Sequence, residues 1–157
     1  LDGIRLPRPL SPHLSARAAG QTIEIAPLKA TADAQSERDR FIVEGAGGLL
    51  VPLNDRDLMA DLIRELGLPV LVVARSTLGT INHTLLTLEA LRTRQLPVVG
   101  VVMNGPLNDD NREAIERYGQ VEVLGQLPAF DRVSRETVLR MASLIDPHGR
   151  LLDRVFA

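Results

Sequence analysis

The sequence predicts an α/β fold with three layers and a mostly parallel sheet. Two runs, at residues 69–74 and 98–103, are continuously apolar and rich in valine, as expected for strands buried on both faces of a parallel sheet. Segments with helical spacing of apolar residues alternate with such runs, which indicates right-handed βαβ crossovers. The chain has 157 residues, enough for one hydrophobic core. We therefore expect a single α/β domain over residues 1–157.

The first 40 residues carry weaker signals. Ser11 and Pro12 are typical of an N-cap and the first helical position, and Gly20 ends the short helix that they predict. Residues 22–25 have the composition of a strand. Residues 28–40 are mostly polar helix formers, so they predict a solvated surface helix or loop.

Residues 41–67 predict a strand, a loop and a helix. Phe41, Ile42 and Val43 form a short apolar run that leads into a glycine-rich loop at 44–48. Residues 57–66 place apolar side chains near one helical face, and Gly67 follows as a suitable C-terminal cap. The apolar positions of this helix are Leu58, Ala60, Leu62, Ile63 and Leu66.

The rest of the chain continues the alternation. After the strand at 69–74, Ile81, Leu85, Leu88 and Leu91 predict a helix over residues 80–94. A strand at 98–103, a helix at 111–118 and a strand at 121–124 follow. Ser134 is a typical N-cap for a last helix over residues 134–145.

Composition limits the kinds of partner. The net charge is −2 with no block of Lys or Arg, which argues against electrostatic capture of nucleic acid or anionic lipid. No apolar run reaches the roughly 18 to 20 residues that a membrane-spanning helix needs. Cysteine is absent, which excludes disulfides and fits a reducing compartment. We expect a cytoplasmic protein whose partners are small molecules or protein, with no nucleic acid and no membrane.

The candidate site residues follow the predicted strands, because ligands of open α/β sheets bind at the carboxyl ends of the strands. Those ends are residues 44–48, 75–79, 104–105 and 126–128. The Glu44 carboxylate would suit a Mg²⁺ ion that bridges phosphate oxygens, and the following glycines would let backbone N–H groups approach an oxyanion. A solvated glycine-rich turn would have the same sequence. Both explanations are open from the residues alone.

Two other strand ends have a simpler explanation, which the residues alone favour. Gly79 and Thr80 precede a helix whose first N–H groups would attract a carboxylate or a phosphate, but an ordinary N-cap by Thr80 explains the same residues. The Asn104 amide would suit the edge of a nucleotide base, whereas Asn-Gly is also a common turn.

A phosphate-binding P-loop is absent from these 157 residues. The motif needs a glycine-rich turn followed by a lysine that reaches the β- and γ-phosphates. Lys29 is the only lysine, and no glycine lies near it. It is therefore not a P-loop lysine.

Several segments together resemble the ATP-dependent dethiobiotin synthetases, in that family's order and over about Leu6 to Pro128. Residues 43–48 alone are shared with related P-loop ligases such as the cobyrinic acid amidases, but their combination with residues 78–83 at this spacing is specific. The segments that carry the resemblance are residues 11–14, 41–48, 52–53, 78–87, 100–104 and 124–128.

The resemblance implies a P-loop NTPase type of fold and a reaction. The family converts 7,8-diaminononanoate (7,8-diaminopelargonate), CO₂ and ATP to dethiobiotin, ADP and phosphate, the penultimate step of biotin synthesis. A substrate amine becomes a carbamate, ATP phosphorylates the carbamate, and the second amine closes the ureido ring. Mg²⁺ and ATP are the implied cofactor and cosubstrate.

The resemblance also implies roles for the glycine-rich loop. Glu44 would be the catalytic Mg²⁺ ligand. The loop would lie along the nucleotide and the substrate, with contacts from Glu44, Gly45, Ala46 and Gly47.

Two further groups of residues receive roles by the same resemblance. One group would bind the adenine edge: Asn104 and Gly105 would contact the base, and Pro128, Ala129 and Phe130 would flank it. The other group would offer helix-start N–H groups to the tail carboxylate of the substrate across a homodimer interface, so that two subunits share one active site; its members are Leu78, Gly79, Thr80, Ile81 and Asn82.

The family's P-loop, its carbamate lysine, a serine one helical turn later and an aspartate Mg²⁺ ligand would all precede Leu1. We therefore interpret the sequence as the C-terminal part of a dethiobiotin synthetase-like domain that lacks the leading P-loop unit. The alternative is a non-catalytic pseudoenzyme or assembly module without ATP binding. The family's late acidic contact falls near Arg135, with Glu136 one place off, so neither residue is assigned a role.

Overall fold

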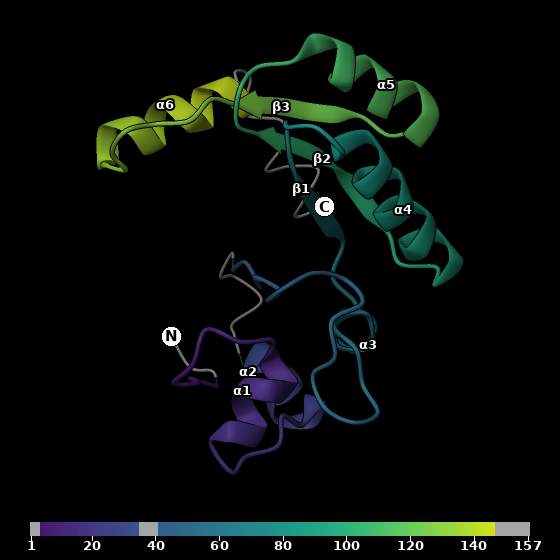
Figure 1. Ribbon diagram of the computed structural model, residues 1–157, viewed down its shortest axis with the longest axis vertical. Coiled ribbons are helices and arrows are strands. Elements are labelled where there is room, and N and C mark those ends of the chain that lie inside the picture. The colour runs from purple at the N-terminus through teal and green to yellow at the C-terminus, as the bar shows by residue number, and fades with distance from the viewer. Residues whose placement is uncertain (1–3, 35–40, 147–157) are drawn as a thin grey trace. The chain divides into compact units, whose positions relative to one another are not determined.

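The computed structural model describes residues 4–34 and 41–146, and the chain forms two compact units (Figure 1). Unit 1 is Leu1–Leu68 and unit 2 is Pro69–Ala157. Within the described residues, no helix combines the length and the apolar character needed to cross a bilayer. The single domain expected over residues 1–157 stays a prediction.

Unit 1 contains α1 (Pro12–Ala18), α2 (Ile25–Asp33) and α3 (Met59–Leu66). The predicted first helix is confirmed, with Pro12 in its first turn, although the Ser11 side chain makes no capping hydrogen bond. The predicted helix at 57–66 is also confirmed, since Gly67 ends α3 with a φ of +65°. The core of the unit consists of Ala16, Ile23, Leu53, Met59 and Leu62.

Two strands predicted in this unit are wrong. Ile25 begins α2 instead of ending a strand, and Ile23 instead packs into the core. Residues 41–43 form no strand, and Ile42 is 88% exposed. A strand forms only where a neighbour pairs with its backbone, and among the described residues neither segment has one. Of the segment predicted as a surface helix or loop, residues 28–33 belong to α2, and residues 35–40 lie outside the described residues.

Unit 2 alternates strands and helices as predicted. The three strands among its described residues are parallel and lie in the order β1-β2-β3, so the central strand is hydrogen-bonded on both sides. The elements are β1 (Val70–Arg75), α4 (Thr80–Thr93), β2 (Val98–Asn104), α5 (Asp109–Gly119), β3 (Val123–Leu127) and α6 (Arg135–Ile145).

The helices of unit 2 cover both faces of the sheet, which confirms the three layers. Helices α4 and α5 lie beside each other on one face (Figure 1), where Leu88 and Ile115 pack against Val101 and Met103. Helix α6 approaches the opposite face at β3, where a Cβ added to Gly125 would lie 3.0 Å from the Ile145 Cα.

Strand β1 differs from the expectation of burial on both faces. Val73 is 66% exposed, whereas Val102, with which it pairs on β2, is buried. On this face of the sheet α6 packs chiefly against β3. The last strand also begins later than predicted. Gln120 has a φ of +44° after α5, and β3 starts at Val123 instead of residue 121.

The core beneath α4 gives a test of the packing. Leu88 is 1% exposed and Leu86, on the same helix, is 55% exposed. We expect Leu88→Ala to lower the free energy of unfolding by about 2 to 5 kcal/mol, because it leaves a cavity in the core. Leu86→Ala is the matched control and should change that free energy by less than about 0.5 kcal/mol. Denaturant unfolding followed by circular dichroism measures both, and equal effects would contradict the packing described here.

Candidate functional site

The glycine-rich loop of unit 1 is an exposed turn. Gly47 and Gly48 have φ values of +93° and +126°, which a residue with a Cβ rarely adopts. The loop is closed by a 3.2 Å hydrogen bond from the Val51 N–H to the Gly48 carbonyl oxygen. Glu44, Gly45 and Ala46 precede it and are exposed as well. The loop therefore presents its backbone and one carboxylate to solvent.

Glu44 fits a magnesium ion only as one of several ligands. Among the described residues, no group of three or more His, Cys, Asp or Glu side chains could hold a metal ion. Mg²⁺ is commonly bound through one or two carboxylates, with phosphate oxygens and water as the other ligands. The exposed carboxylate of Glu44 suits that pattern and does not form a metal cage by itself.

A cavity of about 690 Å³ in unit 1 opens beside this loop, and the sequence did not predict it. Its wall is mostly apolar, with Arg8 and Glu44 among its few polar groups. The wall is built by residues 4–12, α1, α2, residues 41–46 and α3. Because its apolar side chains come from segments far apart in the sequence, no local pattern marks the cavity.

In the described part of unit 2 the carboxyl ends of β1, β2 and β3 meet at one edge of the sheet. The Ser76 N–H donates to the Asn104 carbonyl oxygen at 3.0 Å, and the Gly105 N–H donates to the Leu127 carbonyl oxygen at 2.9 Å. These bonds continue the strand pairing past the strand ends. They bring Asn104 and Gly105 between the loop that follows β1 and the Pro128 that follows β3. The fourth predicted strand end, residues 44–48, belongs to unit 1.

The turn after β2 is held tightly against the loop after β1. The Ser76 hydroxyl donates to the Pro106 carbonyl oxygen at 2.5 Å, and Ser76 is buried. Gly105 has a φ of +129°, and an added Cβ would lie 2.8 Å from the Ser76 Oγ. Position 105 thus excludes a side chain both by its backbone conformation and by contact. The Asn104 side chain remains exposed at this edge.

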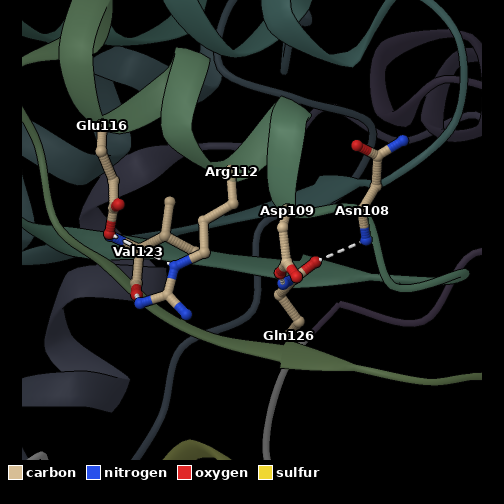
Figure 2. A network of polar contacts seen from close by, with 6 residues as sticks. All are labelled: Asn108, Asp109, Arg112, Glu116, Val123 and Gln126. Carbon is tan, nitrogen blue, oxygen red and sulfur yellow. Dashed lines mark hydrogen bonds and ion pairs between the residues drawn. The ribbon is translucent and has the colours of Figure 1, made fainter.

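A network of polar contacts fixes α5 against β3 (Figure 2). Near the start of the helix, Gln126 accepts a hydrogen bond from the Asn108 N–H and donates one to Asp109. One turn further, Arg112 donates to the Val123 carbonyl oxygen at 3.2 Å, and Glu116 accepts from the Val123 N–H at 3.1 Å.

No role was predicted from the sequence for Ser76, Asn108 or Gln126. Asn108 precedes two aspartates at a helix start, a recognisable N-cap signal, and its side chain does accept from the Asn111 N–H. Gln126 is a polar residue between the apolar positions of a short strand, a weaker signal.

The start of α4 differs from an ordinary N-cap. Gly79 occupies the cap position with a φ of +91°, so Thr80 is the first helical residue and not the cap. Thr80 is 5% exposed, and its Oγ1 has no hydrogen-bond partner among the described residues. Leu78 just before it is fully exposed, and Asn82 is exposed in the first turn. No side chain among the described residues caps this helix, and of its first N–H groups that of Thr80 donates to the Thr77 carbonyl oxygen at 3.1 Å.

The residues after β3 line the same edge. Pro128 and Phe130 are half-buried and Ala129 is exposed. The Arg140 guanidinium lies 5.9 Å from the centroid of the Phe130 ring, within the range of a cation–π contact. Arg135 and Glu136 are exposed in the first turn of α6.

The chain belongs to a family described as an AAA domain, whose model matches residues 1–137. The open parallel sheet of unit 2, with helices on both faces, agrees with a P-loop NTPase-like fold.

Curated relatives confirm the resemblance stated from the motifs. An ATP-dependent dethiobiotin synthetase BioD from Paramagnetospirillum magneticum is 49% identical over 138 residues, covering 87% of this chain and 65% of that protein. The BioD of Brucella ovis is 50% identical over 132 residues, covering 84% of this chain and 60% of that protein. A biotin biosynthesis bifunctional protein BioCD from Bordetella avium is 61% identical over 98 residues, which are 62% of this chain and 21% of that protein. The chain thus spans about 60 to 65% of the length of the two dethiobiotin synthetases.

The unpaired hydroxyl of Thr80 gives a test of the α4 start. We expect Thr80→Val to leave the free energy of unfolding unchanged or to raise it by about 1 kcal/mol, because it removes a buried polar atom that makes no hydrogen bond. Thr80→Ala is the comparison, and it should lower that free energy because it also removes a buried methyl group. Thermal and denaturant unfolding of the ligand-free protein measure both. A loss of more than about 1 kcal/mol in Thr80→Val would contradict the unpaired state.

Proposed function

We propose that the protein containing this chain closes the ureido ring of dethiobiotin in biotin biosynthesis. Its substrates would be 7,8-diaminononanoate, CO₂ and ATP, and its products dethiobiotin, ADP and phosphate. The observation that carries the proposal is the 49% to 50% identity, over 84% to 87% of this chain, to relatives named ATP-dependent dethiobiotin synthetase. Such a reaction needs a base-binding edge, a group that helps to neutralise phosphate charge and a place for the tail carboxylate of the substrate.

The adenine-binding edge is proposed at the carboxyl ends of β2 and β3. Asn104 is exposed, and its amide carries both a donor and an acceptor, as recognition of the adenine edge requires. Gly105 is bonded to the Leu127 carbonyl oxygen, which places the residues after β3 next to it. Pro128, Ala129 and Phe130 would then flank the ring with apolar surface.

Glu44 is proposed as the carboxylate that binds Mg²⁺ on the phosphates of ATP. The bound ion would neutralise developing charge on the transferred phosphoryl group. Gly45, Ala46 and Gly47 lie in an exposed loop, and small or absent side chains there would let a nucleotide or substrate approach the backbone closely. At this loop the chain itself would contribute the Glu44 carboxylate and accessible backbone N–H groups.

The tail carboxylate of the substrate is proposed to bind at the start of α4, which runs from Thr80 to Thr93. Uncapped N–H groups at the start of a long helix favour an anion. The fully exposed Leu78 beside them would contact the alkyl chain of the substrate. We propose that Leu78, Gly79, Thr80, Ile81 and Asn82 serve the active site of a second subunit in a cytoplasmic homodimer.

Replacement of the proposed magnesium ligand tests the reaction. In the intact protein, Glu44→Gln should lower the rate of Mg²⁺- and ATP-dependent dethiobiotin formation by about 100-fold or more, because an amide binds Mg²⁺ much more weakly than a carboxylate. The exposed Glu65→Gln on α3 removes the same charge and should leave the rate within about twofold of the original. Product formation by chromatography measures both. Retained activity in Glu44→Gln would remove the role given to this residue.

A binding measurement separates the enzyme from the non-catalytic alternative. Titration calorimetry of the intact protein with ATP and Mg²⁺ should give measurable binding, and Asn104→Ala should weaken it by about tenfold because a base-edge hydrogen-bond pair is lost. Thr93→Ala, at the far end of α4, should bind as the original does. No binding by the unaltered protein would favour the pseudoenzyme or assembly module.

A further inference from the structure

The turn between β2 and α5 is bonded from both neighbouring strands. On the β1 side, the Ser76 hydroxyl donates to the Pro106 carbonyl oxygen. On the β3 side, the Leu127 carbonyl oxygen accepts from the Gly105 N–H, and the Gln126 side chain accepts from the Asn108 N–H at 2.9 Å. Asn104, the last residue of β2, therefore lies at the start of a turn whose backbone is hydrogen-bonded at Gly105, Pro106 and Asn108.

Gln126 uses both ends of its carboxamide in this arrangement (Figure 2). Its Oε1 accepts from the Asn108 backbone, and its Nε2 donates to the Asp109 Oδ1 at 2.7 Å. In the sheet, Gln126 pairs with Met103, the residue just before Asn104. A carboxylate at position 126 would keep the acceptor and lose the donor, and an apolar side chain would lose both.

Gln126 is not the only attachment of α5, because other residues cap the helix and join it to β3. The Asn108 side chain already caps the helix by accepting from the Asn111 N–H at 2.9 Å. Arg112 and Glu116 already join the helix to β3 through the Val123 backbone. The bonds of Gln126 add an attachment at Asn108 and Asp109, where the turn that begins at Asn104 runs into α5.

We propose that Gln126 and Ser76 are positioning residues for recognition of the nucleotide base, which hold the turn that begins at Asn104 from opposite sides. The inference rests on the proposed function, in which Asn104 and Gly105 contact adenine. Neither positioning residue needs to touch the nucleotide. They set where the Asn104 amide lies, and a small displacement of a hydrogen-bonding group lowers discrimination between bases.

The test compares nucleotide binding and turnover in the intact protein. Gln126→Glu places a second carboxylate beside Asp109, so we expect it to weaken ATP binding by about tenfold and to reduce the preference for ATP over GTP by a similar factor. The KM for ATP should rise by the same factor, whereas kcat should stay within about twofold. Ser76→Ala should change binding and KM in the same direction by a smaller factor.

A double variant provides the rescue. In Gln126→Glu with Asp109→Asn, the new amide can donate to the new carboxylate, which restores the hydrogen bond with its polarity reversed. We expect the double variant to recover most of the ATP binding. Glu113→Gln, an exposed change of one charge on the same helix, is the control and should bind ATP as the original does.

The outcomes separate the positioning role from the proposed reaction. If the unaltered protein binds ATP but forms no dethiobiotin, the proposed reaction is wrong, and the affinities for ATP and GTP still test the positioning role. A lower melting temperature in Gln126→Glu with unchanged affinity for both nucleotides would overturn the positioning role. An absence of rescue in the double variant would overturn it too. An unaltered protein that binds no nucleotide would overturn both proposals.

Discussion

The parallel pairing of β2 with both of its neighbours is the constraint on which unit 2 depends. Val101 and Met103 on this strand are inaccessible to solvent and pack under α4 and α5. Hydrogen bonds continue past the strand ends, from Ser76 to Asn104 and from Gly105 to Leu127. The same interaction that builds the core thus sets the positions of the exposed residues at the sheet edge, because a register shift would move every one of them.

The two proposed binding regions of unit 2 differ in what holds them. The turn after β2 is fixed by the Ser76 side chain, just after β1, and by side-chain and backbone groups of β3. The start of α4 instead depends on backbone conformation at Gly79 and on burial of the Thr80 side chain, whose hydroxyl has no partner among the described residues. A fixed turn suits discrimination between similar bases, whereas uncapped helix N–H groups suit a carboxylate of any chain length.

Much of unit 2 could be predicted from the sequence because its signals are local. Valine-rich runs, the leucine spacing of α4 and the N-cap Ser134 each act within a few residues. The errors come from properties that depend on distant partners. Residues 41–43 are apolar enough for a strand, but no described segment pairs with them. Val73 is exposed although it lies in a valine-rich run, because burial depends on what packs over that face of the sheet, and there α6 packs chiefly against β3.

In the candidate site, too, features with local signals could be predicted and features that depend on distant partners could not. Glu44, Asn104 and Gly79 could be proposed from the sequence because they follow apolar runs or precede a helix. Ser76 and Gln126 were given no role, since their bonds to Pro106 and Asn108 span 30 and 18 residues of sequence. The cavity beside Glu44 was missed for the same reason.

The contact between positions 76 and 105 also restricts which residues can occupy two loops, the one after β1 and the one after β2. A side chain at 105 would occupy the space that the Ser76 hydroxyl fills, 2.8 Å away, and that hydroxyl in turn holds the next carbonyl group, of Pro106. A larger residue at 76 would press on the same turn. The size of the side chain at one position therefore limits the size that the other can carry, so natural substitutions at positions 76 and 105 should be interpreted together.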